Sequence, residues 1–163
     1  MDRWLANAYT YEDWMRVVKK VQTKMTDEVI AQAIASMPPE VQALSESELT
    51  ETLKIRRSKL PEEMSSYYGM LAKYIDLVGS NSRELFELTR LENGDVQARI
   101  FKMNKEKEKG KMLYERLIKR SETKEIRLHG LGKQDEFKII GTTKKSILIR
   151  IIGGDGKDSI SDL

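Results

Sequence analysis

Hydrophobic residues in the first part of the chain recur every three or four positions, which is the spacing of one helix face. Residues 11–22 carry such a stripe and predict a first helix with one buried face. A second stripe follows Thr26, whose hydroxyl suits the N-cap position. Pro38 and Pro39 end this second helix, because a proline disfavours helical backbone at the residue before it.

Two further helices are predicted in this part of the chain. Ser45, with Glu48 three residues later, matches a capping box and opens a third helix. Leu60–Pro61 opens a fourth, because proline suits the first helical position, and its apolar stripe extends to Ile75. The sequence therefore predicts a subdomain of four short helices over residues 1–76.

From residue 77 onward the hydrophobic pattern changes to a period of two, which is typical of β-strands. The fold class is therefore α+β, with a β-rich subdomain over residues 77–163. Ser146–Ile152 is nearly all apolar, which predicts a central strand covered on both faces. The predicted strands are Leu85–Arg90, Val96–Met103, Lys111–Lys119, Glu125–His129, Glu136–Ile140, Ser146–Ile152 and Ser159–Ile160.

A hairpin insertion is predicted at about residues 87–119. Asn93–Gly94 separates two alternating runs, and an Asn-Gly pair in that position is the strongest short hairpin signal. The next loop, Asn104–Gly110, contains the charged run KEKEK and has no apolar side chain to bury. We therefore expect the insertion to protrude as an arm with a solvated tip.

The most specific local motif is Gly153–Ser161, which matches the calcium-binding nonapeptide G-G-x-G-x-D-x-U-x. Two weaker copies, Gly79–Phe86 and Gly130–Phe137, keep the glycine, an acid five residues later and an apolar residue two beyond it. Each glycine follows an apolar strand end, namely Leu77–Val78, Leu128 and Ile151–Ile152. This G-x4-[DE]-x-[FI] repeat predicts stacked solenoid-like turns, with the hairpin inserted between the first and the second.

Two interpretations of these turns remain open. In the structural interpretation, each acid accepts hydrogen bonds from backbone N–H groups of its own turn and closes it. In the other, Asp135, Asp155 and Asp158 are ligands of a calcium ion, for which carboxylate oxygens are suited. The middle copy carries Leu131 and Lys133 at loop positions that are glycine in the full motif, which favours the structural interpretation.

Composition excludes several kinds of chemistry. The chain has no cysteine, so disulfides, cysteine zinc sites and thiol catalysis are excluded. Its one histidine, His129, excludes any site that needs two imidazoles. P-loop, GxSxG and HExxH motifs are absent, and no apolar run approaches the roughly 18 residues of a membrane helix. We therefore expect a chain without catalytic activity of its own.

The net charge of +3 is unevenly distributed. Residues 1–101 have 13 basic and 16 acidic side chains, whereas residues 102–163 have 16 basic and 10 acidic ones. Lys102–Arg127 is the most basic stretch and defines a weaker alternative, a basic surface for phosphate-rich partners. Its single aromatic residue, Tyr114, is too few for a base-stacking platform, so nucleic acid is not expected as a partner.

Several stretches together suggest a family. The segments KEIRLHGLGKQDEF (residues 124–137) and RIIGGDGKD (residues 150–158) are the most specific. With the preceding helices, they resemble the middle region of large Gram-negative outer-membrane proteins that join a calcineurin-like metallophosphoesterase to a surface-antigen-type β-barrel. The resemblance covers the chain from about Met25 to Asp158. The family pattern has more acids in the turns than this chain has.

The resemblance implies a non-catalytic connecting or scaffolding module of an exported protein. The phosphatase needs a two-metal cluster with several histidines, so none of its catalytic residues carries over to this chain. The sequence stops within a predicted turn-and-strand unit, and we expect a segment of a longer polypeptide whose flanking domains are its partners. The implied location is the periplasm or outer membrane, with the module peripheral to the membrane. The alternative function is that of a calcium-binding β-roll-like module.

Overall fold

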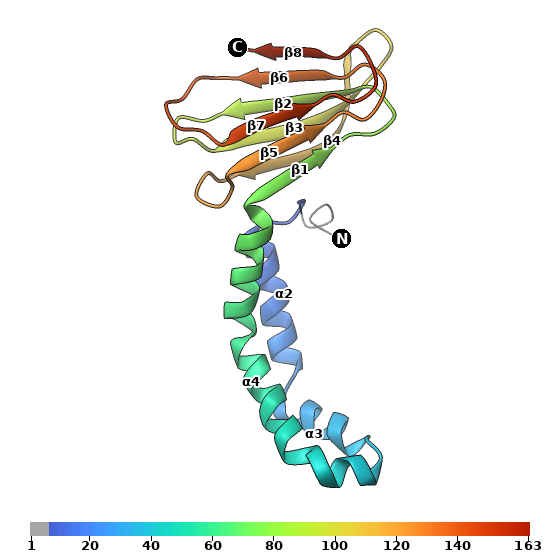
Figure 1. The fold of residues 1–163 in the computed structure, drawn as a ribbon, viewed down its shortest axis with the longest axis vertical. Helices are drawn as coiled ribbons and strands as arrows, with labels where there is room; N and C mark the ends of the chain where they lie inside the picture. Colours follow the sequence, from blue (N-terminus) through green and yellow to red (C-terminus); the bar gives the residue numbers. More distant parts are fainter. Residues whose placement is uncertain (1–6) are drawn as a thin grey trace. The chain divides into compact units, whose positions relative to one another are not determined.

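A computed structural model describes residues 7–163, and within them three helices precede eight strands in two sheets (Figure 1). This confirms the predicted α+β class. The helices are α2 (Tyr11–Lys24), α3 (Asp27–Ala35) and α4 (Pro39–Ala72). The strands are β1 (Tyr74–Val78), β2 (Glu84–Arg90), β3 (Val96–Met103), β4 (Lys109–Ile118), β5 (Glu125–His129), β6 (Glu136–Ile140), β7 (Leu148–Ile152) and β8 (Ser159–Asp162).

The described residues divide into two compact units. The helical unit consists of residues 9–68, and the β unit consists of residues 7–8 and 69–163. Most of α4 belongs to the helical unit, and its last turn belongs to the β unit. None of the helices within residues 7–163 combines the length and the apolar character needed to cross a membrane.

The first two helices form where the hydrophobic pattern predicts them. The hydroxyl of Thr26 accepts a hydrogen bond from the backbone N–H of Val29 at 3.3 Å, which confirms Thr26 as the N-cap of α3. α3 ends at Ala35, before the two prolines. Pro39 then serves as the first residue of α4, where its missing N–H costs no helical hydrogen bond.

Aromatic and charged contacts join the helices within the helical unit. The ring of Trp14 in α2 lies 5.9 Å from that of Tyr67 and 6.2 Å from that of Tyr68, both in α4. The guanidinium of Arg57 in α4 donates to the carboxylate of Asp27 at the start of α3, at 2.7 Å. Lys54 of α4 also lies 3.0 Å from the carboxylate of Asp27, so the helices are held by aromatic contacts and by two basic side chains.

The predicted third and fourth helices are one continuous helix, α4. Ser45 was predicted as an N-cap, but it lies inside the helix and donates its hydroxyl to the carbonyl of Val41 at 2.7 Å. Pro61 was predicted at a first helical position, but it also lies in the interior. The helix ends at Ala72, so Ile75, which the pattern assigned to the fourth helix, belongs to β1.

A side chain from α2 compensates for the proline inside α4. An interior proline leaves the carbonyl four residues earlier without its helical N–H partner. That carbonyl belongs to Arg57, and the side-chain amide of Gln22 donates to it at 2.8 Å. The tertiary contact with α2 therefore satisfies the group that would otherwise favour a break between the predicted third and fourth helices.

The β unit consists of two sheets connected by short turns (Figure 1). The first sheet has the order β1-β5-β7, and all its pairs are parallel. The second has the order β4-β3-β2-β6-β8, in which β2, β6 and β8 are parallel and β3 and β4 are antiparallel additions. Each strand of the first sheet is followed in the chain by a strand of the second: β1 by β2, β5 by β6, and β7 by β8.

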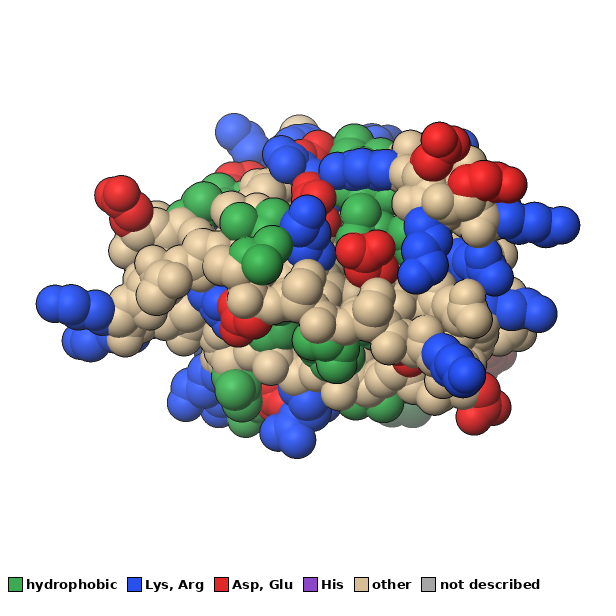
Figure 2. Space-filling model, turned by 90° about the horizontal axis from the view of Figure 1, so that it is seen from above, with side chains coloured by type: hydrophobic (Ala, Val, Ile, Leu, Met, Phe, Trp, Pro, Cys, Tyr) green, Lys and Arg blue, Asp and Glu red, His purple; other side chains and the backbone are tan. Residues whose placement is uncertain are grey.

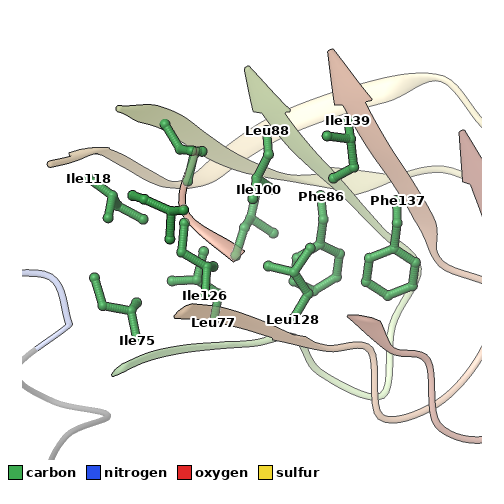
Figure 3. Packing of buried hydrophobic residues seen from close by; sticks show 13 residues of the cluster. Ile75, Leu77, Phe86, Leu88, Ile100, Ile118, Ile126, Leu128, Phe137 and Ile139 are labelled. Atoms are coloured by element: carbon green, nitrogen blue, oxygen red, sulfur yellow. The ribbon is translucent and has the colours of Figure 1, made fainter. Parts of the chain in front are cut away.

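The core of the β unit contains the inward-facing side chains of both sheets (Figure 3). The rings of Phe86 in β2 and Phe137 in β6 stack with centroids 4.8 Å apart. The other core residues are Ile75, Leu77, Leu88, Val96, Ala98, Ile100, Ile118, Ile126, Leu128, Ile139 and Ile147.

The inserted hairpin is part of this core, which corrects the prediction of a protruding arm at residues 87–119. The Asn93–Gly94 turn forms as predicted, and Gly94 has a φ of 90°. However, Val96, Ala98 and Ile118 at the base of the hairpin have no solvent exposure. The alternating apolar residues of β3 and β4 thus extend the second sheet, and the exposed charged residues lie at the tip.

The strand predicted at Ser146–Ile152 is also corrected. β7 begins at Leu148 and is the outer strand of the first sheet among the described residues, not a central strand. Its side chains alternate between exposed and half-buried, and Leu148 remains 57% exposed. The strand is apolar as predicted, but among residues 7–163 it has a neighbouring strand on one side only.

We expect Gln22→Ala to lower the free energy of unfolding of the helical unit by about 1 kcal/mol, because the carbonyl of Arg57 loses its donor. In a Pro61→Ala background, residue 61 supplies a backbone N–H to the same carbonyl, so Gln22→Ala should cost much less. Urea denaturation of the four chains gives the coupling energy. Equal costs in the two backgrounds would contradict this role of Gln22.

Candidate functional site

The strand register brings the three G-x4-acid turns side by side. The residues directly before the three glycines are partners in the first sheet, and the residues directly after the three acids are partners in the second. The glycines therefore form one row, Gly79, Gly130 and Gly153. The acids form a second row, Glu84, Asp135 and Asp158, which we call the acid row.

Backbone hydrogen bonds connect neighbouring members of the acid row. Asp135 Oδ1 accepts from the N–H of Glu84 at 2.8 Å, and Asp158 Oδ1 accepts from the N–H of Asp135 at 3.0 Å. Glu84 Oε2 accepts from the N–H of Ser80 in its own turn at 3.1 Å. The structural interpretation expected every acid to bind its own turn, but the carboxylates of Asp135 and Asp158 bind the turn before.

The glycine row leaves room for the carboxylates of the acid row. A Cβ on residue 130 would lie 2.6 Å from Asp135 Oδ2, and a Cβ on residue 153 would lie 2.2 Å from Asp158 Oδ2. These separations are too short for any side chain. The glycine and the acid five residues later thus form one unit, in which the missing Cβ creates the space for the carboxylate.

Asp135 has the most perturbed environment in the acid row. It is 2% exposed, and Oδ2 has no hydrogen-bond partner among the described residues. Burial raises the pKa of Asp135 to about 6; the N–H of Glu84 opposes this shift, and the nearby carboxylates of Glu84 and Asp158 add to it. The side chain therefore changes its protonation state near pH 6, which is well above the pH at which an ordinary aspartate does so.

The three predicted calcium ligands differ in their surroundings. Asp135 and Asp158 are joined by a hydrogen bond from the backbone N–H of Asp135 to the carboxylate of Asp158. Asp155 is exposed, and its N–H donates to the carbonyl of Leu131 at 2.8 Å. Within residues 7–163, no group of three or more His, Cys, Asp or Glu side chains is arranged to hold a metal ion. The structure thus brings two of the three residues together.

The middle turn contains two side-chain residues in left-handed backbone. Leu131 has a φ of 74° and Lys133 a φ of 78°. In the register of the turns they align with Gly154 and Gly156, which have positive φ values of 91° and 155°. Both turns therefore have positive φ at these two positions, which is without strain where glycine is present and with strain where it is not.

A charged network on the outer face of the first sheet was not predicted from the sequence. Nε2 of His129 lies 3.0 Å from the carboxylate of Asp76, and Arg127 lies 3.9 Å from the same carboxylate. Glu125 interacts with Arg150 and Arg127, which together lower its pKa. The signal was available, since alternate residues of adjacent strands share a face, but finding it requires the strand pairing.

No family model, no curated protein and no solved structure matches this chain.

We expect Lys133→Gly to raise the free energy of unfolding by about 1 kcal/mol, because glycine adopts the left-handed backbone without steric cost. Lys157→Gly is the matched control: Lys157 is also exposed in a turn but lacks a positive φ, so the same change should destabilise the chain. Chemical denaturation measures both. Destabilisation by both substitutions would show that the strain at Lys133 is not significant.

We expect Asp135→Asn to remove a pH dependence of stability. Because the folded-state pKa of Asp135 is raised to about 6, the folded chain holds this proton more tightly than the unfolded chain, and its stability falls as pH rises from about 4 to 6. An asparagine still accepts from the N–H of Glu84 and cannot ionise. Between pH 4 and pH 7, the free energy of unfolding of the variant should therefore rise by roughly 1–3 kcal/mol relative to that of the natural chain. A difference that is constant with pH would contradict the raised pKa.

Proposed function

We propose that this chain is a non-catalytic connecting and scaffolding module whose β unit is a stack of three solenoid-like coils. Each coil consists of a strand of the first sheet, a G-x4-acid turn and a strand of the second sheet. The resemblance to the middle region of outer-membrane proteins motivates the wider context: an exported polypeptide, a periplasmic or outer-membrane location, and flanking domains as partners. The β unit supplies a spacer in this arrangement.

The proposal rests mainly on the hydrogen bonds that the carboxylates of the acid row accept. The carboxylates of Asp135 and Asp158 each accept a backbone N–H from the preceding coil, so they connect one coil to the next. A carboxylate that accepts a buried backbone hydrogen bond in this way has a structural role. The stacked Phe86 and Phe137 rings, two residues beyond the acids, add an apolar contact between the same coils.

Calcium binding is the second candidate function, and one observation favours it. Asp135 Oδ2 has no hydrogen-bond partner among residues 7–163, and both it and the carbonyl oxygen of Gly153 lie close to Gly130, at 2.6 Å and 2.3 Å from the place that a Cβ on that residue would take. A carboxylate and a carbonyl are both suitable oxygen ligands for calcium. The two functions assign different roles to the same side chains, so one experiment separates them.

Thermal unfolding is followed with EDTA and with calcium up to about 10 mM, which exceeds the dissociation constants of weak extracellular calcium modules. The scaffold role predicts a midpoint that does not change with calcium. A calcium site predicts a midpoint that rises with concentration, because an ion bound only by the folded state stabilises it.

Two substitutions of Asp158 complete the experiment. Asp158→Asn keeps an oxygen that accepts the N–H of Asp135, whereas Asp158→Ala removes it. As a scaffold, the chain should lose about 1–3 kcal/mol of stability in the alanine variant and much less in the asparagine variant. If the unfolding midpoint of the natural chain rises with calcium and both substitutions abolish this rise, this turn binds calcium and the scaffold role proposed for it is wrong.

A further inference from the structure

The outermost coil, β7 with its turn and β8, leaves the core of the β unit partly open. Ile149 and Ile151 of β7 face the core but are only partly buried, whereas Ile126 and Leu128 of β5 have no solvent exposure. β7 and β8 are the outer strands of the two sheets within the described residues. Seen from above, the β8 end of the β unit shows hydrophobic side chains among charged ones and among the tan surface of backbone and other side chains (Figure 2).

The apolar residue two positions after each acid is also more exposed in the outermost coil than in the other two. Phe86 and Phe137 are fully buried against each other, but Ile160, which pairs with Phe137 in the register, is 63% exposed. Its side chain continues the row of the two rings and has no coil beyond it among residues 7–163. An exposed apolar side chain on an outer strand is a typical feature of a surface that pairs with another segment.

The hydrogen bonds of the acid row end at the same coil. The N–H of Glu84 donates to Asp135, and the N–H of Asp135 donates to Asp158. The N–H of Asp158 has no corresponding carboxylate acceptor among the described residues. The outermost coil therefore presents a backbone donor in the position where the two other coils meet an acid.

We propose that the β7–β8 edge is a docking surface for a strand–turn–strand segment of the same G-x4-acid class. The acid of that segment accepts the N–H of Asp158, and the apolar residue two positions later covers Ile160. Its two strands pair in parallel with β7 and β8, which continues the interface that β5 and β6 already make with them. The proposal rests on the stacked coils of the proposed function.

The partner class follows from contacts that this chain makes twice. The acid must lie five residues after a glycine, because a side chain at the glycine position would occupy the space of the carboxylate. The first strand must alternate apolar residues to cover Ile149 and Ile151, and the strands must be parallel to reproduce the register. An unrelated apolar peptide would cover the side chains but would not supply the acceptor for Asp158.

The test adds a peptide with the sequence of residues 124–141, the middle coil, to the full chain. We expect the unfolding midpoint to rise with peptide concentration and amide exchange to slow at Asp158 and along β7 and β8. The control peptide carries alanine in place of Asp135. It should bind at least roughly tenfold more weakly, because it lacks the carboxylate that accepts the N–H of Asp158. Equal effects of the two peptides, or no effect of either, would overturn the proposal.

Two variants of the chain control for position. Ile160→Lys places a charge on the edge and should abolish the peptide effect, and the free chain should keep its stability because Ile160 is largely exposed. Val17→Lys, at a similarly exposed position of α2, should leave the effect unchanged. A peptide effect that persists in Ile160→Lys contradicts docking at this edge.

Self-association is a separate outcome. If sedimentation shows that the natural chain forms a dimer that Ile160→Lys abolishes, and the peptide does not compete with it, the occupant is a second copy and the proposed coil is wrong. Slow amide exchange of Glu84 and Asp135 in the free chain tests the stacked coils themselves. If these amides exchange rapidly, the proposed function fails; if they are protected and the peptide has no effect, only the docking fails.

Discussion

The β unit depends on one repeated interaction, the hydrogen bond from the backbone N–H of one acid to the carboxylate of the next. Two such bonds connect Glu84, Asp135 and Asp158 across three turns. They fix the turns in register, and a register fixed at the turns places every inward side chain of the following strands on the same face. The burial of Phe86 against Phe137 is a consequence of that alignment.

This interaction has an electrostatic cost, because it collects carboxylates in a region with little solvent. The cost is concentrated at Asp135, which has an acid on either side and a raised pKa. The outer face of the first sheet has the opposite arrangement: Arg127 and Arg150 lie between and beside the carboxylates, so the pKa of Glu125 is lowered. The β unit thus combines a row of acids that form no ion pair within residues 7–163 with a network on its surface in which opposite charges are paired.

Much of the fold could be predicted from local pattern. The bounds of β3, β5 and β6 agree with the alternating hydrophobic runs, and the Asn93–Gly94 turn agrees with its sequence signal. The repeat of glycine and acid identified the turns that hold the acid row. The errors occur where distant residues decide the outcome. Pro61 reads as a helix start, but Gln22 satisfies the carbonyl that the proline leaves free.

The sequence by itself determined the α+β class with the helices before the strands, and the pairing of each glycine with an acid, because these follow from side-chain periodicity and from steric demands within a few residues. Only the tertiary structure decided which turn each acid binds, and that the apolar strand β7 is the outer strand of its sheet within residues 7–163. The physical reason is that a hydrophobic run shows that a strand buries its side chains, whereas the order of strands in the sheet decides which element packs against them. The carboxylate of Asp158 likewise meets the N–H of Asp135 only because parallel pairing places their turns side by side.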